Sequence, residues 1–359
     1  MRIRYWWFIL LLVGVVIVVL VTNNAQLGPS FEKKPAGPQE PIQPNPFRSQ
    51  YLGFSSVFNS TEQRDIMVSF EIAGENSDYL MIVTPINWSQ YVDGWEGVDD
   101  SKFDELERWV LIAGAYDLRL YISIDPLESG DRTQIDQDIP WEDKSFENPD
   151  VRAAFSNFAK RVAVELEPDY LTLGMEINTY YGANPEDFEN FVSLYGETYD
   201  FVKQGDIKIG PTFQYDEMSD CGVGWDYEVV GEFDDYSDFL SLTTYPRICF
   251  NNLEEIPENY YSRIGEYSSK PIVIGESGWP TNSSVFPSSE EEQEEFLNFL
   301  LEETNKLDVE LVIWWFMHDW VHGGYDEYNY FGSMGLLNSD GSSKLSWDDW
   351  QEYHGREKR

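Results

Sequence analysis

Residues 170–178 read YLTLGMEIN, and residues 271–280 read PIVIGESGWP. Each segment is a short apolar run that reaches a glycine and then a glutamate, Glu176 in the first and Glu276 in the second. Apolar runs of this length predict strands buried on both faces, as in parallel sheets. A carboxylate at the end of such a strand is costly to bury unless it is paired or takes part in chemistry. The two segments therefore predict two parallel strands that end at a functional edge.

Six further runs of the same kind occur along the chain, and amphipathic segments separate them. Together the eight predicted strands cover residues 51–57, 79–84, 118–124, 170–178, 207–215, 239–245, 271–279 and 311–318. Between them, apolar residues at helical spacing and the capping residues Asn148, Asn184 and Ser289 predict helices. Eight strands alternating with helices over about 300 residues predict an α/β fold of the (β/α)8 TIM-barrel type. An open doubly wound sheet is the alternative, but no glycine-rich phosphate loop follows the first strand.

The N-terminus predicts a membrane anchor. Arg2 and Arg4 precede an apolar run from Tyr5 to Val21, and about 17 residues is the lower limit for a helix that spans a bilayer. The two arginines place the N-terminus in the cytoplasm and everything after the run outside it. We therefore expect a membrane-anchored protein with an extracellular catalytic domain. A cleaved signal peptide, which would release a secreted protein, is the alternative.

The composition divides the chain into three parts. Residues 1–27 form the predicted cytoplasmic stub and anchor, residues 28–50 are rich in proline and predict an extended linker, and residues 51–359 form the predicted barrel. With 24 basic and 65 acidic residues, the chain has a formal charge of −41. Such an acidic surface disfavours nucleic acid and anionic substrates, and it is also what solubility or a salty medium would select. We expect a monomer.

The two cysteines, Cys221 and Cys249, follow the fifth and sixth predicted strands. Their spacing is not that of a zinc site, so we expect no metal. Consecutive barrel strands are neighbours, which places both cysteines in adjacent loops on one face. Outside the cytoplasm such a pair is free to oxidise, and the sequence predicts a disulfide between them.

The carboxyl ends of barrel strands meet at one mouth, so Glu176 and Glu276 are expected to face each other there. Two carboxylates at one mouth are what glycoside hydrolysis requires, one to protonate the leaving oxygen and one to attack the sugar or activate water. The alternative is that each glutamate is simply paired with a neighbouring lysine or arginine. No cofactor is needed for this chemistry.

The two motifs resemble those of glycoside hydrolase clan A. The segment from Gly275 to Pro280 is similar to the nucleophile segment of family 17 β-1,3-glucanases and of family 53 endo-β-1,4-galactanases. The segment from Gly174 to Asn178 resembles the family 53 form, with Met175 where the clan usually has asparagine. The resemblance implies that Glu176 is the general acid/base and Glu276 the nucleophile of a retaining enzyme. In that mechanism Glu176 should have the higher pKa.

The resemblance also suggests residues around the pair. Tyr245 ends the sixth strand, where the clan often has a group that is hydrogen-bonded to the nucleophile, and Trp315 rather than Trp314 is expected to face the sugar, because strand residues alternate. Further candidates for substrate binding are Asn178, Tyr181, Trp279, His318, Asp319, Asp125, Asn87 and Gln214.

The sequence thus predicts a retaining β-glycoside hydrolase that acts on a β-linked polysaccharide or oligosaccharide. A catalytically idle barrel that binds or scaffolds glycans at the cell surface is the alternative outside enzymes. A Ser-His-Asp hydrolase is disfavoured, because the chain has only three histidines, His318, His322 and His354, and no Gly-x-Ser-x-Gly segment.

Overall fold

The computed structural model describes residues 46–56, 62–219, 227–320 and 330–359. The predicted anchor (1–27), nearly all of the predicted linker and Cys221 lie outside these ranges, and what was predicted of them stays a prediction. Within the described ranges, no helix is both long and apolar enough to cross a membrane.

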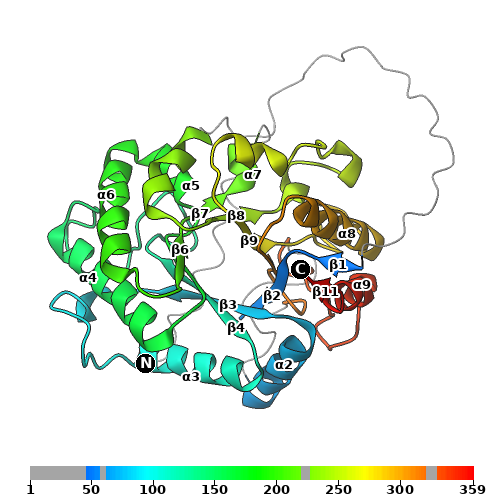
Figure 1. Cartoon of the computed structure of the whole chain (residues 1–359), viewed down its shortest axis with the longest axis horizontal. Helices are drawn as coiled ribbons and strands as arrows, with labels where there is room; N and C mark the ends of the chain where they lie inside the picture. Colours follow the sequence, from blue (N-terminus) through cyan, green and yellow to red (C-terminus); the bar gives the residue numbers. More distant parts are fainter. Residues whose placement is uncertain (1–45, 57–61, 220–226, 321–329) are drawn as a thin grey trace, which may run out of the picture.

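The described chain folds into a parallel β-barrel surrounded by helices (Figure 1). The strands are β2 (Tyr51–Ser55), β3 (Tyr79–Pro85), β4 (Arg119–Asp125), β5 (Tyr170–Leu173), β6 (Lys208–Gly210), β7 (Thr212–Gln214), β8 (Leu240–Thr244), β9 (Ile272–Ser277) and β10 (Leu311–Trp314). They pair in the order β6-β5-β4-β3-β2-β10-β9-β8-β7. All eight predicted strands are found, and most are shorter than predicted.

The nine strands fill eight positions around the barrel, each of which is called a stave below. The number is eight because β6 and β7 are two pieces of one stave, interrupted by Pro211. On one side of this stave, the amide of Thr212 donates to the carbonyl of Gly174 at 3.1 Å. On the other, the amide of Ser241 donates to the carbonyl of Pro211 at 2.9 Å. Proline lacks an N–H and cannot donate to the ladder, which accounts for the interruption. The ring is therefore closed, and the alternative of an open sheet is wrong.

The helices follow the strands in the order expected of βα units. They are α2 (Gln63–Asn76), α3 (Ser101–Ala115), α4 (Pro149–Arg161), α5 (Ile177–Ala183), α6 (Pro185–Val202), α7 (Tyr215–Met218), α8 (Glu290–Lys306) and α9 (Leu345–His354). Asn148 caps α4 as predicted, since its side chain accepts the amide of Asp150 at 2.9 Å. The side chain of Asn184 instead donates to the carbonyl of Thr133 at 2.6 Å, so α6 begins without a side-chain cap.

Several 3₁₀ segments occur among the described residues, most of them between α7 and β9. They are η3 (Tyr227–Tyr236), η4 (Pro246–Ile248), η5 (Leu253–Glu255) and η6 (Ser262–Glu266), while η1 (Trp88–Gln90) follows β3. The π-helical turn η2 (Val162–Leu166) directly continues α4. Cys249 directly follows η4 and is not a free thiol. Because Cys221 is not described, the bridge between the two stays a prediction.

Alternating residues of each strand divide the core in two. Inside the barrel lies a compact cluster of large side chains: Tyr79, Met81, Tyr121, Tyr170, Met175, Phe239, Val273, Leu311 and Ile313. On β10, the residues between these, Val312 and Trp314, belong to the larger core between the strands and the helices. A barrel filled by side chains is a packed core rather than a channel, and this leaves the carboxyl ends of the strands to carry chemistry.

The two ends of the described chain meet at the amino-terminal rim of the barrel. The strand β1 (Phe47–Arg48) pairs in parallel with β11 (Glu357–Lys358), beside which the C-terminus lies in Figure 1. The folded domain therefore begins at least four residues earlier than the predicted boundary at residue 51, because Phe47 already pairs with Glu357.

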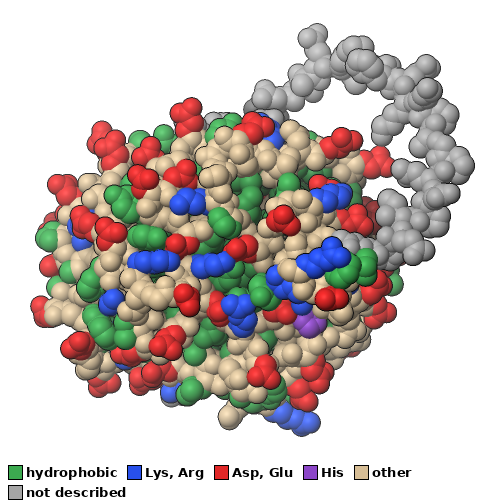
Figure 2. Space-filling model, in the orientation of Figure 1, with side chains coloured by type: hydrophobic (Ala, Val, Ile, Leu, Met, Phe, Trp, Pro, Cys, Tyr) green, Lys and Arg blue, Asp and Glu red, His purple; other side chains and the backbone are tan. Residues whose placement is uncertain are grey.

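Basic side chains gather on the face of the molecule that is turned toward the viewer in Figures 1 and 2, although the protein as a whole is strongly acidic. Figure 2 shows lysine and arginine side chains across the middle of the face and acidic ones around its edge. Those near the strand starts are paired, Arg119 with Asp169, and Lys208 with Glu310 at 2.7 Å. The pairing neutralises these cations, so we assign the face a structural role.

Candidate active site

The fourth stave ends in a sharp turn that aims Glu176 into the mouth of the barrel. Strand β5 stops at Leu173, earlier than the predicted end at residue 178, and Ile177 already begins α5. Between them Gly174 has φ +128° and Glu176 has φ 51°. A left-handed conformation costs a residue other than glycine about 1–2 kcal/mol. Such local strain is found preferentially at functional residues.

Gly174 itself is required by packing. A Cβ atom at this position would lie 2.8 Å from Cγ2 of Ile177 and 2.8 Å from Cζ of Phe191. Gly275, which precedes the second glutamate, is confined in the same way, since a Cβ there would lie 2.3 Å from Oγ of Ser241. The glycine before each glutamate thus allows the close approach of neighbouring elements.

One strand brings the two carboxyl groups together. In the pairing of β8 with β9, Thr243 lies directly opposite Glu276. The hydroxyl of Thr243 donates to Oε1 of Glu176 at 2.7 Å, so the neighbour of one glutamate is bonded to the other. Directly after the end of the same strand, the hydroxyl of Tyr245 donates to Oε2 of Glu276 at 2.8 Å. The predicted hydrogen bond between Tyr245 and the candidate nucleophile is therefore present.

The two carboxyl groups have unlike surroundings. Glu276 is 5% exposed, and its pKa is raised well above the ordinary value, first by burial and then by the negative charge of Glu176. The hydrogen bond from Tyr245 and the charge of Arg132 oppose this shift. The higher pKa that the sequence predicts for Glu176 stays a prediction. Glu176 has a cationic partner that sequence reasoning did not find.

That partner is Arg132, from the loop between β4 and α4. One of its Nη atoms forms an ion pair with Asp125 at the end of β4, and its Nε donates to Oε2 of Glu176 at 3.2 Å. The guanidinium is 11% exposed and the Glu176 side chain 16%. Nothing in the local sequence of a long polar loop predicts that one of its arginines turns inward. The prediction of Asp125 as a site residue placed it correctly at the mouth, where it binds this arginine.

Two further carboxyl groups extend the site along α7. Asp216 accepts the amide of Tyr245, and burial raises its pKa to about 6. Glu217 accepts the hydroxyl of Thr179 at 2.6 Å. Burial, followed by the negative charges of Glu176 and Asp216, raises the pKa of Glu217 to about 7 against the opposing hydrogen bond of Thr179. The sequence analysis did not single out either residue, although both directly follow a predicted strand.

The tryptophans of the eighth stave obey the predicted alternation. Trp314 is fully buried on the helix side, where its Nε1 donates to the carbonyl of Met334 at 2.8 Å and its ring packs against Phe296 of α8. Trp315 is half-buried and packs against the cluster inside the barrel. The choice of Trp315 as the inward-facing residue is therefore correct in orientation. Its contact with a sugar stays a prediction.

Several predicted binding residues are occupied by protein partners. Asn178 holds the backbone of Gln214, donating to its carbonyl at 3.0 Å and accepting its amide at 2.8 Å. The side chain of Gln214 in turn accepts the amide of Glu217 at 2.8 Å. Asp319 forms a buried ion pair with Lys344 at 2.6 Å. These contacts give the residues structural roles at the mouth, which their positions at strand ends could not distinguish from binding roles.

The remaining predicted residues lie around the same rim. Trp279 is fully buried and donates to Oγ of Ser288 at 2.8 Å, and Asn87 donates to Asp100 at 3.0 Å. Tyr181 is half-buried against Phe188. His318 is buried, and burial lowers its pKa to about 4, so it is neutral near pH 7. Within the described ranges, no group of histidine, cysteine, aspartate and glutamate side chains is arranged to hold a metal ion.

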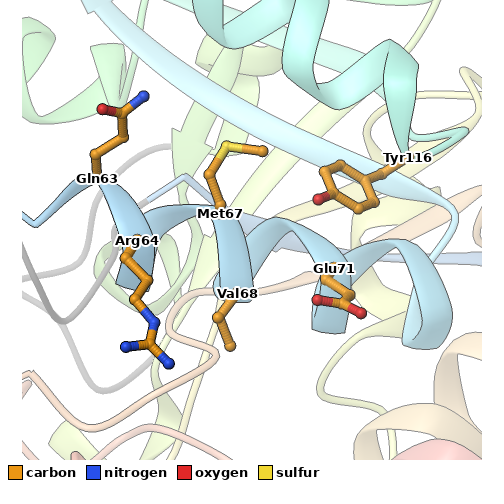
Figure 3. A pocket seen from close by; sticks show the side chains of 6 residues that line it. All are labelled: Gln63, Arg64, Met67, Val68, Glu71 and Tyr116. Carbon is orange, nitrogen blue, oxygen red and sulfur yellow. The ribbon is translucent and has the colours of Figure 1, made fainter.

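A hollow on the outer surface lies away from this chemistry. It is lined by residues of α2 and by Tyr116 at the end of α3, as Figure 3 shows: Gln63, Arg64, Met67, Val68, Glu71 and Tyr116. It lies on the helical layer rather than at the carboxyl ends of the strands, where barrels carry their active sites. We therefore assign the chemistry to the mouth.

Comparisons with known proteins place this fold. No family profile and no curated protein sequence matches the chain. Among solved structures, GH5_18 from Bifidobacterium longum subsp. infantis superposes with a TM-score of 0.66 at 13% identity, covering 87% of this chain and 80% of the other. A GH5_18 variant from Bifidobacterium longum subsp. longum in complex with Manβ1-4GlcNAc gives a TM-score of 0.62 at 15% identity, covering 85% and 77%.

An exo-β-1,4-mannosidase from Opitutaceae bacterium strain TAV5 gives a TM-score of 0.64 at 14% identity, covering 85% of this chain and 59% of the other. At these identities the likeness concerns the fold, and it confirms the predicted (β/α)8 barrel. Two of the three structures are GH5_18 proteins, whereas the two strand-end motifs of this chain resemble families 53 and 17.

Proposed function

We propose that this chain is a retaining β-glycoside hydrolase, with Glu276 as nucleophile and Glu176 as general acid/base. The observation that carries the proposal is the joint placement of both carboxyl groups by β8 and the residue that follows it, through Thr243 to Glu176 and through Tyr245 to Glu276. Paired carboxyls at a barrel mouth are the machinery of glycoside hydrolysis. The alternative of two glutamates held in separate salt bridges is not supported, because among the described residues Glu276 has no cationic hydrogen-bond partner.

The proposed reaction is a double displacement. In the first step a carboxylate oxygen of Glu276 attacks the anomeric carbon, the glycosidic bond breaks, and Glu176 gives its proton to the leaving oxygen. In the second step Glu176 takes a proton from water, the water oxygen attacks the anomeric carbon, and the ester bond to Glu276 breaks. The configuration at the anomeric carbon is inverted twice and therefore retained.

For the substrate we propose a β-linked oligosaccharide or polysaccharide, with β-mannosides as the first class to test. Support comes from the fold, which is shared with a structure bound to Manβ1-4GlcNAc and with an exo-β-1,4-mannosidase. The half-buried, inward-facing Trp315 offers a flat apolar surface of the kind on which sugar rings stack. The protein's charge of −41 argues against polyanionic substrates.

The decisive experiment is hydrolysis of aryl β-glycosides by the purified protein, with β-mannoside, β-glucoside and β-galactoside compared, followed by β-mannan, β-1,3-glucan and β-1,4-galactan. Proton NMR of the first product formed should show the β-anomer, as retention requires. Formation of the α-anomer would refute the double displacement. Glycan binding without turnover of any substrate would instead favour the idle, glycan-binding barrel.

We further propose that the barrel is displayed outside the cytoplasm on the anchor at residues 1–27, with residues 28–50 as a spacer. The support is the charge and apolarity of the N-terminal sequence. Fractionation of cells that produce the full chain, with protease added outside, should find the barrel in the membrane fraction and accessible. Non-reducing mass spectrometry of the same material should find Cys221 joined to Cys249, and two free thiols would contradict the predicted bridge.

A further inference from the structure

The loop that follows β4 forms a short hairpin over the mouth of the barrel. Leu127 and Ile135 form an antiparallel bridge, and the amide of Glu128 donates to the carbonyl of Gln134 at 3.0 Å. At the tip, the side chain of Asp131 accepts the amide of Thr133 at 3.1 Å. Arg132 therefore lies on a defined turn, and its side chain points back toward the barrel.

The guanidinium of Arg132 joins two neighbouring staves. It forms an ion pair with Asp125 of β4 and donates to Oε2 of Glu176, which follows β5. The other charged or titratable groups around Glu176 are Glu217 on α7, Tyr245 after β8 and Glu276 on β9. The charge of Arg132 acts on both Glu176 and Glu276, and removing it would leave these two carboxyl groups without a neighbouring cation among the described groups named here.

Both oxygens of Glu176 accept hydrogen bonds, Oε1 from Thr243 at 2.7 Å and Oε2 from Arg132 at 3.2 Å. Neither oxygen is therefore free to face a glycosidic oxygen while both hydrogen bonds are in place. Among the described residues, by contrast, the buried Oε1 of Glu276 has no hydrogen-bond partner. The two carboxyl groups thus differ in their hydrogen bonds: both oxygens of Glu176 are occupied by protein donors, whereas one oxygen of Glu276 is not.

One of the two bonds to Glu176 must therefore open before Glu176 can donate a proton to a glycosidic oxygen. Thr243 belongs to β8, which is hydrogen-bonded to β7 on one side and to β9 on the other, so it is fixed by the barrel. Arg132 is carried by a hairpin whose tip residues Thr133 and Gln134 are exposed. Arg132 also keeps a second partner, Asp125, when it leaves Glu176. The bond from Arg132 is the one that can open.

We propose that Arg132 is a positioning residue for the proposed hydrolysis: it fixes Glu176 through Oε2 in the free enzyme and withdraws to Asp125 when substrate enters the mouth. Oε2 of Glu176 is then free to face the glycosidic oxygen to which Glu176 gives its proton. The inference rests on the proposed function. It adds a step in which substrate binding frees the oxygen that takes part in proton transfer.

The test compares three variants, Arg132→Gln, Arg132→Lys and Asp125→Asn, through the pH dependence of kcat/KM on an aryl β-glycoside. Loss of the positive charge in Arg132→Gln makes ionisation of the pair harder, so the acidic limb should move up by about 1 pH unit. Arg132→Lys keeps the charge and should restore most of the wild-type profile. Asp125→Asn removes a negative charge and should move the acidic limb in the opposite direction.

If Arg132 and Asp125 had merely structural roles, both variants would lower activity without moving the acidic limbs of their pH profiles in opposite directions. Shifts of opposite sign therefore distinguish the proposed role from a structural one. Near-ultraviolet circular dichroism checks that each variant is folded. Where a variant is too slow to assay, ¹³C NMR titration of the glutamate carboxyls gives the same comparison without turnover. A pH profile of Arg132→Gln that matches the wild type would overturn the inference, whereas wild-type protein that hydrolyses no glycoside would overturn the proposed function itself.

Discussion

The two glutamates at the mouth differ in their partners, and their replacement should have different consequences. Glu176→Gln removes the proton donor, so we expect hydrolysis of glycosides with poor leaving groups to fall by about 10²–10⁴-fold. The first step on an activated aryl glycoside should be largely spared, because its leaving group departs without protonation. Glu276→Gln removes the proposed nucleophile and should abolish turnover of both kinds of substrate. Single-turnover kinetics on the two substrates would check this, and equal loss on both for Glu176→Gln would contradict its role as acid.

Tyr245 should tune the acidity of Glu276. Its hydroxyl donates to Oε2 of Glu276 and opposes the rise in the pKa of that carboxyl. Tyr245→Phe should therefore raise this pKa further, by about 1 unit if the hydrogen bond contributes about 1.4 kcal/mol. Since the nucleophile must be ionised, the acidic limb of kcat/KM should move to higher pH.

Tyr330→Phe is the matched control for this change. Tyr330 is another buried tyrosine beside Tyr245, but its hydroxyl reaches the backbone carbonyl of Tyr245 rather than a carboxyl group. Its removal should leave the pH profile in place. If both variants shift the limb alike, the effect belongs to packing around Tyr245 and not to the hydrogen bond.

At the scale of residues, the sequence predicted the site where a residue's place on a strand determined the direction in which its side chain points. Glu276 and Tyr245 were predicted from their places at the ends of strands, and Trp315 from alternation along its strand. Arg132 and Thr243 were not predicted, for different reasons. Arg132 reaches the mouth through the fold of a hairpin that short-range patterns do not encode. Thr243 looked like an ordinary strand residue until the register opposite Glu276 was known.

At the scale of elements, the connection after β10 depends on one buried ion pair. Lys344, which precedes α9, is 1% exposed and pairs with Asp319 at 2.6 Å. It also donates to the carbonyl of Ser333 at 3.0 Å, so it ties two parts of this connection together. Lys344→Met would leave Asp319 buried without its cation, at a cost of about 3–5 kcal/mol in the free energy of unfolding.

Urea unfolding measures this cost, and a double variant shows where it comes from. Adding Asp319→Asn to Lys344→Met removes the unpaired charge but keeps an acceptor for the amide of Gly335, which Asp319 accepts at 3.0 Å. We expect the double variant to recover most of the lost stability. A double variant as unstable as the single one would show that the packing of the lysine chain, rather than the charge, is what matters.

The order and kind of the elements were largely predictable, because βα units have separate signals in strands and helices. The ends of the elements were less so. The fourth stave was predicted to run through Glu176, but φ angles at Gly174 and Glu176 turn the chain into α5 directly after it. Between β8 and β9 the chain forms only 3₁₀ segments, and the proline-rich, aromatic sequence there shows no regular helical stripe.

For the whole molecule, one carboxyl at the amino-terminal rim should make stability depend on pH. Burial alone would raise the pKa of Asp78, but hydrogen bonds from His354, Arg48 and the amide of Leu52 outweigh it and hold the pKa well below the ordinary value. A carboxyl whose pKa is lower in the folded state contributes stability above its unfolded pKa of about 4, and this is lost as the pH falls toward the folded value.

Asp78→Asn should therefore destabilise the protein near pH 6 and have a smaller effect near pH 2.5. The expected difference is on the order of 2 kcal/mol in the free energy of unfolding by urea. Acidification also discharges the many other carboxyl groups, so only the difference between variant and wild type is diagnostic. An equal effect of the substitution at both pH values would contradict the linkage.

The pairing of β1 with β11 closes the chain almost into a circle. The amide of Arg359 donates to the carbonyl of Arg48 at 3.0 Å, and the seam between β10 and β2 is hydrogen-bonded like any other pair of staves. The barrel therefore has no obligatory first stave. A circular permutant that joins residue 359 to residue 46 through a short flexible peptide, and opens the chain at the exposed Gly205 between α6 and β6, should fold with the same circular dichroism spectrum and a cooperative thermal transition.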